Sequence, residues 1–299
     1  VSTKIGRALD PAPRGRDGVW DGPWHGGYDL KVRYDFTYHG VLQQHRESCL
    51  RMGLPRVDAL AIHDLDGMFG GQEVVTRYLQ ELTASTPQET KPGKGGLHAL
   101  WELKEQGHIK AVGIGCNSYE FGSREVCERV MMCGLGVDYI ILAGPYNLLN
   151  QEALDDILPM CREKNVSVLV GAPFASGILA VGSGKLAGGK CSGGASPARS
   201  ARAPSYMYAP ASESIIDKVA AIETVCHEYS VTLPSVALQF PLFHPRVASV
   251  LSGIKSEEEV RQAIAGIREP IPVEFWKELK KQGLIRQDAP IAGDDTQHL

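Results

Sequence analysis

Residues 109–142, IKAVGIGCNSYEFGSREVCERVMMCGLGVDYIIL, contain one full repeat of the pattern that decides the fold. Ile109–Gly115 is apolar and β-branched, Ser123–Cys133 has apolar residues at helical spacing, and Val137–Leu142 is apolar again. Strands buried on both faces have this near-continuous apolar composition, and a helix between two of them is typical of a βαβ unit. The segment therefore predicts two parallel strands joined by a helix.

The same alternation extends along the rest of the chain. Six strands are predicted, at Val1–Ile5, Val57–Ile62, Ile109–Gly115, Val137–Leu142, Val166–Val170 and Val247–Leu251. Helices are predicted at Gly40–Met52, Leu97–Gln106, Ser123–Cys133, Glu152–Lys164, Ser212–Tyr229 and Ser256–Ile264, with shorter ones at Pro234–Leu242 and Val273–Lys281. This order favours a parallel sheet of the α/β barrel type, and because no linker separates two cores, residues 1–299 are predicted as a single domain.

Two segments interrupt the alternation. Residues 8–39 contain Trp20, Trp24 and three Tyr among Gly, Pro and Asp, which predicts a long ordered loop able to line a pocket. Residues 182–205, GSGKLAGGKCSGGASPARSARAPS, are basic and low in complexity, which predicts a flexible insertion.

Composition excludes several classes of function. The chain has 299 residues with 43% hydrophobic and 22% charged residues, as in soluble globular proteins. A formal net charge of -4 provides no positive field for nucleic acid or anionic lipid, and no run reaches the ~18 apolar residues of a membrane helix. The seven Cys form no CxxC pair, which favours reduced thiols. Together with the absence of a signal segment, they predict a cytoplasmic location.

Residues that follow the apolar strands are the candidates for chemistry, because active sites of α/β barrels form at the C-terminal ends of the strands. They are Lys4, His63, Asp64, Asn117, Tyr146, Asn147, Phe174, Ser176, Gly253 and Lys255. No residues have the spacing of a metal site or of a nucleophile motif. Taken singly, Lys4 is typical of a solvated strand end, His63 is as often structural, and Asn117 is a common turn residue.

Several motifs, in their order and spacing, resemble the aldo-keto reductase family. They are STKIGR at 2–7, VDALAIHD at 57–64, KAVGIGCN at 110–117, DYIILAGPYNLLNQ at 138–151, VGAPFASGIL at 170–179, YMYAPAS at 206–212 and VALQFPLFHPRVASVLSG at 236–253. Within the family, the chain looks most like the branch that contains D-threo-aldose 1-dehydrogenases, L-fucose dehydrogenases and pyridoxal 4-dehydrogenases.

The resemblance implies a single (β/α)8 barrel, a nicotinamide cofactor and a catalytic tetrad of Asp, Tyr, Lys and His. Lys4 matches the tetrad Lys and His63 the tetrad His. A Lys ammonium ~4 Å from the Tyr hydroxyl contributes about 4 kcal/mol at an effective dielectric near 20, which lowers the Tyr pKa by roughly three units. The His orients the substrate oxygen.

The family's Asp and Tyr precede the Lys strand, and this chain begins at that strand. We therefore expect two further βα units, roughly 60 residues, upstream of Val1, and a barrel here of about six units. Tyr28, Tyr34 and Tyr38 are more typical of pocket lining or packing than of a replacement for the tetrad Tyr.

The resemblance also implies which residues contact the cofactor. They are Asn117, Tyr146, Phe174, Ser176, Gly177, Gly253, Lys255 and Glu259. Ala143 and Gly171 replace a carboxamide-binding Gln and a stacking Tyr found in many members. Phe174 is expected either to cover the nicotinamide ring or to belong to the core.

The choice of cofactor depends on Glu259, at a position where members that prefer NADP have a basic residue. A carboxylate repels the 2′-phosphate of NADP and accepts a hydrogen bond from a ribose hydroxyl, so NAD is the predicted cofactor. Lys255 and Arg261 keep NADP as the alternative. By itself, Glu259 is also typical of a helix start, where it stabilises the dipole.

The substrate prediction depends on Asp64, which follows the tetrad His where many members have an aromatic residue. A carboxylate suits hydroxyl-rich ligands, so the prediction is oxidation of an aldose, or a related polar alcohol or aldehyde, at C1, with Asp64, Trp20 and Trp24 in the pocket. The alternatives are a cofactor-binding protein without catalysis, comparable to the potassium-channel β subunits that resemble this family, and an incomplete chain that does not fold.

Overall fold

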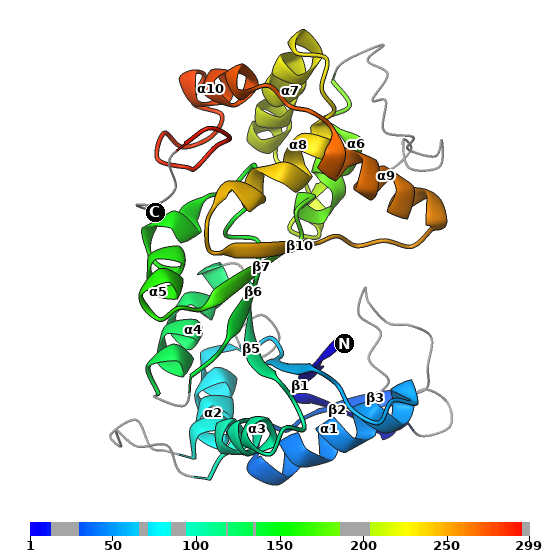
Figure 1. The fold of residues 1–299 in the computed structure, drawn as a ribbon, viewed down its shortest axis with the longest axis vertical. Helices are drawn as coiled ribbons and strands as arrows, with labels where there is room; N and C mark the ends of the chain where they lie inside the picture. Colours follow the sequence, from blue (N-terminus) through cyan, green and yellow to red (C-terminus); the bar gives the residue numbers. More distant parts are fainter. Residues whose placement is uncertain are drawn as a thin grey trace. The chain divides into compact units, whose positions relative to one another are not determined.

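The computed structural model describes residues 1–12, 30–65, 71–84, 94–117, 119–133, 136–185 and 204–294. These residues form two compact units, Val1–Ile140 and Ile141–Leu299 (Figure 1). The division falls inside a strand rather than in a linker, and the prediction of a single domain stays a prediction. No helix in the described ranges is long and apolar enough to cross a membrane.

All six predicted strands are present and belong to one parallel sheet. They are β1 (Ser2–Ile5), β4 (Ala59–Ile62), β5 (Ala111–Cys116), β6 (Tyr139–Ala143), β7 (Ser167–Gly171) and β10 (Val247–Leu251), and they follow one another in this order. In the first unit, Ile5 pairs with Ile62 and Ile62 with Ile114, so the ends of β1, β4 and β5 lie at one edge. Parallel strands in chain order with intervening helices confirm the α/β barrel type of fold.

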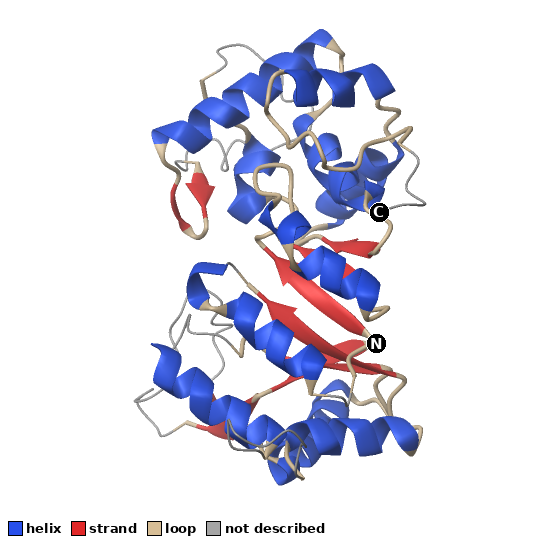
Figure 2. Cartoon of the chain, turned by 90° about the vertical axis from the view of Figure 1, so that its left-hand side faces the viewer, coloured by secondary structure: helices blue, strands red, loops and turns tan. Residues whose placement is uncertain are grey.

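The first unit adds a hairpin and several helices to its strands (Figures 1 and 2). The hairpin strands are β2 (Arg7–Pro11) and β3 (Leu30–Tyr34), and the helices are α1 (Tyr38–Met52), α2 (Gly71–Thr83), α3 (Gly96–Glu105) and α4 (Ser123–Met132), with the 3-10 turn η2 (Tyr119–Phe121) before α4. Residues 8–39 are therefore not a continuous loop. Both of its ends form antiparallel strands, with Arg7 paired to Tyr34 and Leu9 to Val32.

Close packing fixes α3 in this unit. A Cβ on Gly96 would lie 2.2 Å from the backbone oxygen of Phe36, so only glycine allows the helix to start there. Phe36, Leu60 and Ile62 are completely buried in the core of this unit. Thr37 caps α1 by accepting a hydrogen bond from the N–H of Gly40.

The second unit is mainly helical around β7 and β10. Its helices are η3 (Glu152–Asp155), α5 (Ile157–Glu163), η4 (Ala175–Gly177), α6 (Ile178–Val181), α7 (Glu213–Glu228), α8 (Leu233–Gln239), η5 (Phe240–Phe243), α9 (Glu257–Arg268) and α10 (Val273–Lys281). A short hairpin of β8 (Ser205–Tyr206) and β9 (Ala209–Pro210) precedes α7. Ser212 and Ser256 cap α7 and α9, since their side chains accept hydrogen bonds from the N–H groups of Ile215 and Glu259.

Prolines divide two of the predicted helices. The helix predicted at Glu152–Lys164 is a 3-10 turn followed by α5, because Pro159 is tolerated only in a first turn, and Asp156 caps the new start. The helix predicted at Pro234–Leu242 ends at Gln239 as α-helix and continues as a 3-10 turn, since Pro241 provides no N–H for the next bond.

Candidate active site and cofactor cavity

The ends of β4 and β5 bring three predicted site residues together in the first unit. The backbone N–H of His63 donates to the carbonyl of Ile5, which holds the end of β4 against β1. Asn117 follows β5, and its Nδ2 atom lies 3.0 Å from Oδ1 of Asp64. His63, Asp64 and Asn117 therefore form one cluster, as the parallel register predicts.

Asp64 is the centre of this cluster. Its Oδ2 atom lies 3.2 Å from Nε2 of His63 and 2.6 Å from Nη2 of Arg7, and its side chain is 18% exposed. Burial acts to raise the pKa of the Asp64 carboxyl, but the hydrogen bonds and charges of His63, Arg7 and Asn117 outweigh it and lower the pKa to about 2. The cluster therefore holds a carboxylate ionised at every physiological pH.

Arg7 is a member of the cluster that the sequence prediction missed. It lies at the start of β2, and its guanidinium is 5.8 Å from the centre of the Tyr34 ring, which stacks on Tyr78. Burial raises the pKa of the Tyr34 hydroxyl, and the Arg7 charge offsets this only in part. Tyr34 therefore remains protonated near neutral pH, which agrees with its assignment to packing.

Lys4 lies on β1, paired in register with Ala61 of β4. Its side chain is exposed. Within the described ranges it makes no hydrogen bond or ion pair, so it stands beside the strand that carries His63 without joining the Asp64 cluster.

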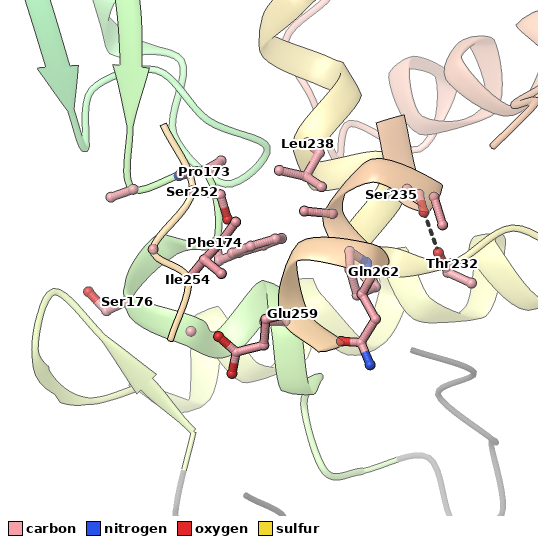
Figure 3. Close-up of a pocket in the computed structure, with 18 of the residues that line it drawn as sticks. Pro173, Phe174, Ser176, Thr232, Ser235, Leu238, Ser252, Ile254, Glu259 and Gln262 are labelled. Atoms are coloured by element: carbon pink, nitrogen blue, oxygen red, sulfur yellow. Dashed lines mark hydrogen bonds between the residues drawn. The ribbon is translucent and has the colours of Figure 1, made fainter. Parts of the chain in front are cut away.

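A separate cavity of about 600 Å³ lies in the second unit. That volume is in the range of small-molecule sites. It is formed by the end of β7, the segment after β10, and helices α8 and α9. Figure 3 shows Phe174 between the residues that follow β10 and those of α9, with Glu259 and Gln262 of α9 at the same wall.

Five predicted cofactor residues line this cavity: Phe174, Ser176, Gly177, Gly253 and Glu259. Ser176 has a positive φ of 60°, and its side chain accepts a hydrogen bond from the N–H of Tyr208, at the turn of the β8–β9 hairpin. A Cβ built on Gly177 or Gly253 would meet no atom within 4 Å, so both glycines leave open space at the cavity wall.

The charge of the cavity wall is negative. Glu259 and Glu269 are its acidic lining residues in the described part of the chain, and no Lys or Arg lines it there. Glu259 accepts a hydrogen bond from the N–H of Lys255 at 2.9 Å, while the Lys255 side chain is exposed outside the lining. Glu269 accepts from both the N–H and the hydroxyl of Thr232.

Comparison with known proteins decides the family. The model of the Aldo/keto reductase family matches residues 1–283. The chain belongs to the aldo/keto reductase family. This aldo/keto reductase is therefore of an oxidoreductase family that acts on small molecules with nicotinamide cofactors.

Its similarity to named members is moderate. This aldo/keto reductase is 32% identical over 285 residues to pyridoxal 4-dehydrogenase of Microbacterium luteolum, covering 95% of this chain and 73% of the relative. It is 30% identical over 287 residues to D-threo-aldose 1-dehydrogenase of Pseudomonas sp, covering 95% and 75%. The solved glycerol dehydrogenase of Gluconobacter oxydans shares its fold, with a TM-score of 0.56 and 17% identity over 98% of this chain and 75% of that chain.

The remaining predicted residues of this aldo/keto reductase lie elsewhere. Tyr146 is completely buried, packed on Phe240 and His244, and does not line the cavity. Its aromatic ring fills the apolar core of the second unit. Trp20 and Trp24 lie outside the described residues. Among the residues that the structure describes, no group of three or more His, Cys, Asp or Glu side chains could hold a metal ion.

Proposed function

We propose that this aldo/keto reductase oxidises an aldose, or a related polar alcohol or aldehyde, at C1 by hydride transfer to a nicotinamide cofactor, with NAD preferred over NADP. The observation that carries the proposal is the half-buried polar cluster of His63, Asp64, Asn117 and Arg7 at the strand ends. A pocket with ionised and amide groups favours a hydroxyl-rich ligand, because an apolar analogue would leave them without partners.

The cavity of the second unit supports a site for the nucleotide part of such a cofactor. Gly177 and Gly253 leave space where a side chain would otherwise intrude, and Phe174 supplies an aromatic surface. We propose that Phe174, Ser176, Gly177 and Gly253 hold the cofactor there. When bound, the oxidised nicotinamide ring supplies the acceptor for the hydride.

The preference for NAD rests on the charge of the lining. A 2′-phosphate beside Glu259 would bring two negative charges together, whereas a ribose hydroxyl could donate to that carboxylate. Lys255 directs its backbone N–H, rather than its ammonium, at Glu259.

The catalytic residues in this proposal are Lys4 and His63. Lys4 provides a positive charge at the end of β1 that can lower the pKa of a proton-transferring hydroxyl, and His63 hydrogen-bonds the substrate oxygen. The names of the two relatives above, an aldose dehydrogenase and a pyridoxal dehydrogenase, support polar substrates.

The test is a turnover assay with aldoses, pyridoxal and a matched set of apolar alcohols, each with NAD and with NADP. We expect NAD-dependent oxidation of at least one polar substrate and none of the apolar set. Oxidation of apolar alcohols alone would contradict the proposal, and saturable cofactor binding without any turnover would favour a binding protein that lacks catalysis.

A further inference from the structure

The ring of His63 has two nitrogens with different surroundings. Nε2 lies 3.2 Å from Oδ2 of Asp64. An ionised carboxylate can only accept a hydrogen bond, so the nitrogen that faces it must carry the proton. Nδ1 has no hydrogen-bond or ion-pair partner within the described ranges, and the side chain is 28% exposed.

We propose that Asp64, held by Arg7 and Asn117, is a positioning residue that fixes the Nε2–H tautomer of His63 and so leaves Nδ1 as the acceptor for a substrate hydroxyl group. This inference rests on the proposed function, because it assigns His63 to the substrate. The inference further specifies which ring nitrogen of His63 binds the substrate hydroxyl group and which residue fixes the tautomer.

Hydrogen bonds hold the Asp64 carboxylate in a fixed orientation. Each of its oxygens has a donor from a different element: Nη2 of Arg7 on β2 is 2.6 Å from Oδ2, and Nδ2 of Asn117 after β5 is 3.0 Å from Oδ1. The backbone at Asp64 has a left-handed φ of 41°, a conformation that non-glycine residues adopt at a cost. Arg7 and Asn117 therefore fix a carboxylate that in turn orients the imidazole.

The His63 backbone is fixed as well. Its N–H donates to the carbonyl of Ile5 at 2.9 Å, so the residue begins its loop from a defined point at the end of the sheet. Among the nearby charged and titratable groups, Arg7 on β2 pairs with Asp64, Tyr34 on β3 lies against Arg7, and Lys4 lies on β1, the strand next to β4. In the described part of the chain, Asp64 is the charged group that contacts the His63 ring, with its Oδ2 atom 3.2 Å from Nε2.

The choice of nitrogen has a consequence for the substrate. A neutral imidazole protonated on Nε2 has a lone pair on Nδ1, which accepts a hydrogen bond and cannot donate one. An alcohol offers a donor to that lone pair, whereas a carbonyl oxygen offers none. Neutral His63 therefore selects the alcohol form of the substrate, and the carbonyl form needs a protonated ring that donates from Nδ1.

Long-range ¹H–¹⁵N correlation spectra of the ¹⁵N-labelled full chain, without cofactor or substrate, test the proposal. His63→Gln identifies the His63 signals by their loss. We expect the neutral ring of wild-type His63 to be in the Nε2–H form, and Asp64→Ala to convert it to a mixture of tautomers. Asp64→Asn, which keeps the size of the side chain, tests whether the charge is needed and should weaken the preference less.

His98 provides an internal control. Its Nε2 atom lies 3.0 Å from Oε1 of Glu102, outside the cluster, so its tautomer should not respond to the Asp64 variants. Glu102→Gln should change His98 and leave His63 unchanged. A wild-type His63 in the Nδ1–H form would overturn the proposal whether or not any variant folds, as would an unchanged tautomer in a folded Asp64→Ala.

The activity readout separates this proposal from the proposed function. If the wild type oxidises an alcohol, Asp64→Ala should lower kcat/KM by about tenfold or more, the value of one lost hydrogen bond of about 1.4 kcal/mol, with NADH affinity unchanged. A wild type without dehydrogenase activity but with the Nε2–H tautomer would contradict the function alone. Full activity in Asp64→Ala would contradict the positioning role alone.

Discussion

Nη2 of Arg7 lies 2.6 Å from Oδ2 of Asp64, although 57 residues separate them along the chain. Arg7 lies two residues after the end of β1 and Asp64 two residues after the end of β4, so the pairing of these two strands brings the two side chains together. The ion pair joins the hairpin strand β2 to the end of the parallel sheet. It links the stability of the first unit to the ionisation of one carboxyl group.

The Asp64 carboxyl should therefore make the protein sensitive to acid. Its pKa is about 2 in the folded protein and ~3.9 in an unfolded chain, so its stabilisation is complete above the unfolded value and is lost as the pH falls toward 2. The loss is on the order of 2 kcal/mol. Urea unfolding between about pH 5 and pH 3 should show a smaller fall in stability for Asp64→Asn than for the wild type.

Asp58 is the control for this measurement. Its pKa is also lowered to about 2, by the N-terminal amine and Lys110, but its side chain is 44% exposed and solvent screens the pairs. Asp58→Asn should leave the pH dependence close to that of the wild type. Equal slopes for the wild type and both variants would show that Asp64 contributes nothing.

If Lys4 has the proposed catalytic role, its replacement by Met should lower kcat by about 100-fold or more, because a proton-transferring hydroxyl would lose the positive charge that lowers its pKa. NADH affinity should change by less than about twofold, which a binding titration measures. Lys110→Met provides the control, since Lys110 is also next to a strand but pairs with Asp58 at the surface. A Lys4→Met enzyme with wild-type kcat would remove Lys4 from the chemistry.

Replacement of Glu259 by Lys should shift the cofactor preference toward NADPH. The substitution removes a repulsive charge near the 2′-phosphate and adds an attractive one, and each of these two changes is worth about 1 kcal/mol at an exposed site. The ratio of the dissociation constants for NADPH and NADH should therefore change by about tenfold or more. Glu257→Lys makes the same change of charge on the same helix but outside the cavity lining. If both variants change the ratio equally, general charge and not position is responsible.

His244 should add a second acid-sensitive step. Burial, and then Arg246 and Arg162, lower its pKa from the ordinary 6.5 to about 4, so the folded state holds the ring neutral. The contribution of the neutral His244 ring to the free energy of unfolding is complete above about pH 6.5 and is lost as the pH falls toward 4. The loss is on the order of 3 kcal/mol.

Thermal or urea unfolding over that range checks the effect of His244. His244→Asn preserves an acceptor for the N–H of Arg246 and should flatten the pH dependence. His227→Asn, at an exposed position, should not. A wild-type stability that stays constant from pH 6.5 to 4 would contradict the assignment.

The sequence predicted the positions of the strands well, but it did not predict the points at which prolines divide the helices. Strands such as Tyr139–Ala143 are near-continuous apolar runs that are largely buried, which few other structures allow. Helix α2 was not predicted, although its buried residues Val75, Tyr78, Leu79 and Leu82 have helical spacing, so the signal was present. The division at Asp156 depends on how Pro159 is accommodated, which periodicity does not report.

The candidate site was predictable where neighbours in sequence or register decide it. His63 and Asp64 are adjacent, and Asn117 follows the strand that pairs with theirs. Arg7 was missed because its partner is distant in sequence and because a charged residue in a hairpin strand is typical of an exposed position. Tyr146 follows a strand as a site residue would, and only tertiary packing shows that its ring belongs to the core.

A fluorescence titration of the chain with NADH and with NADPH, in which tryptophan emission reports binding, tests most directly whether this aldo/keto reductase binds a nicotinamide cofactor and prefers NAD. We expect saturable binding of both cofactors, with NADH the tighter ligand. Absence of saturation in a cooperatively folded chain, or NADPH binding that equals or exceeds that of NADH, would contradict this expectation.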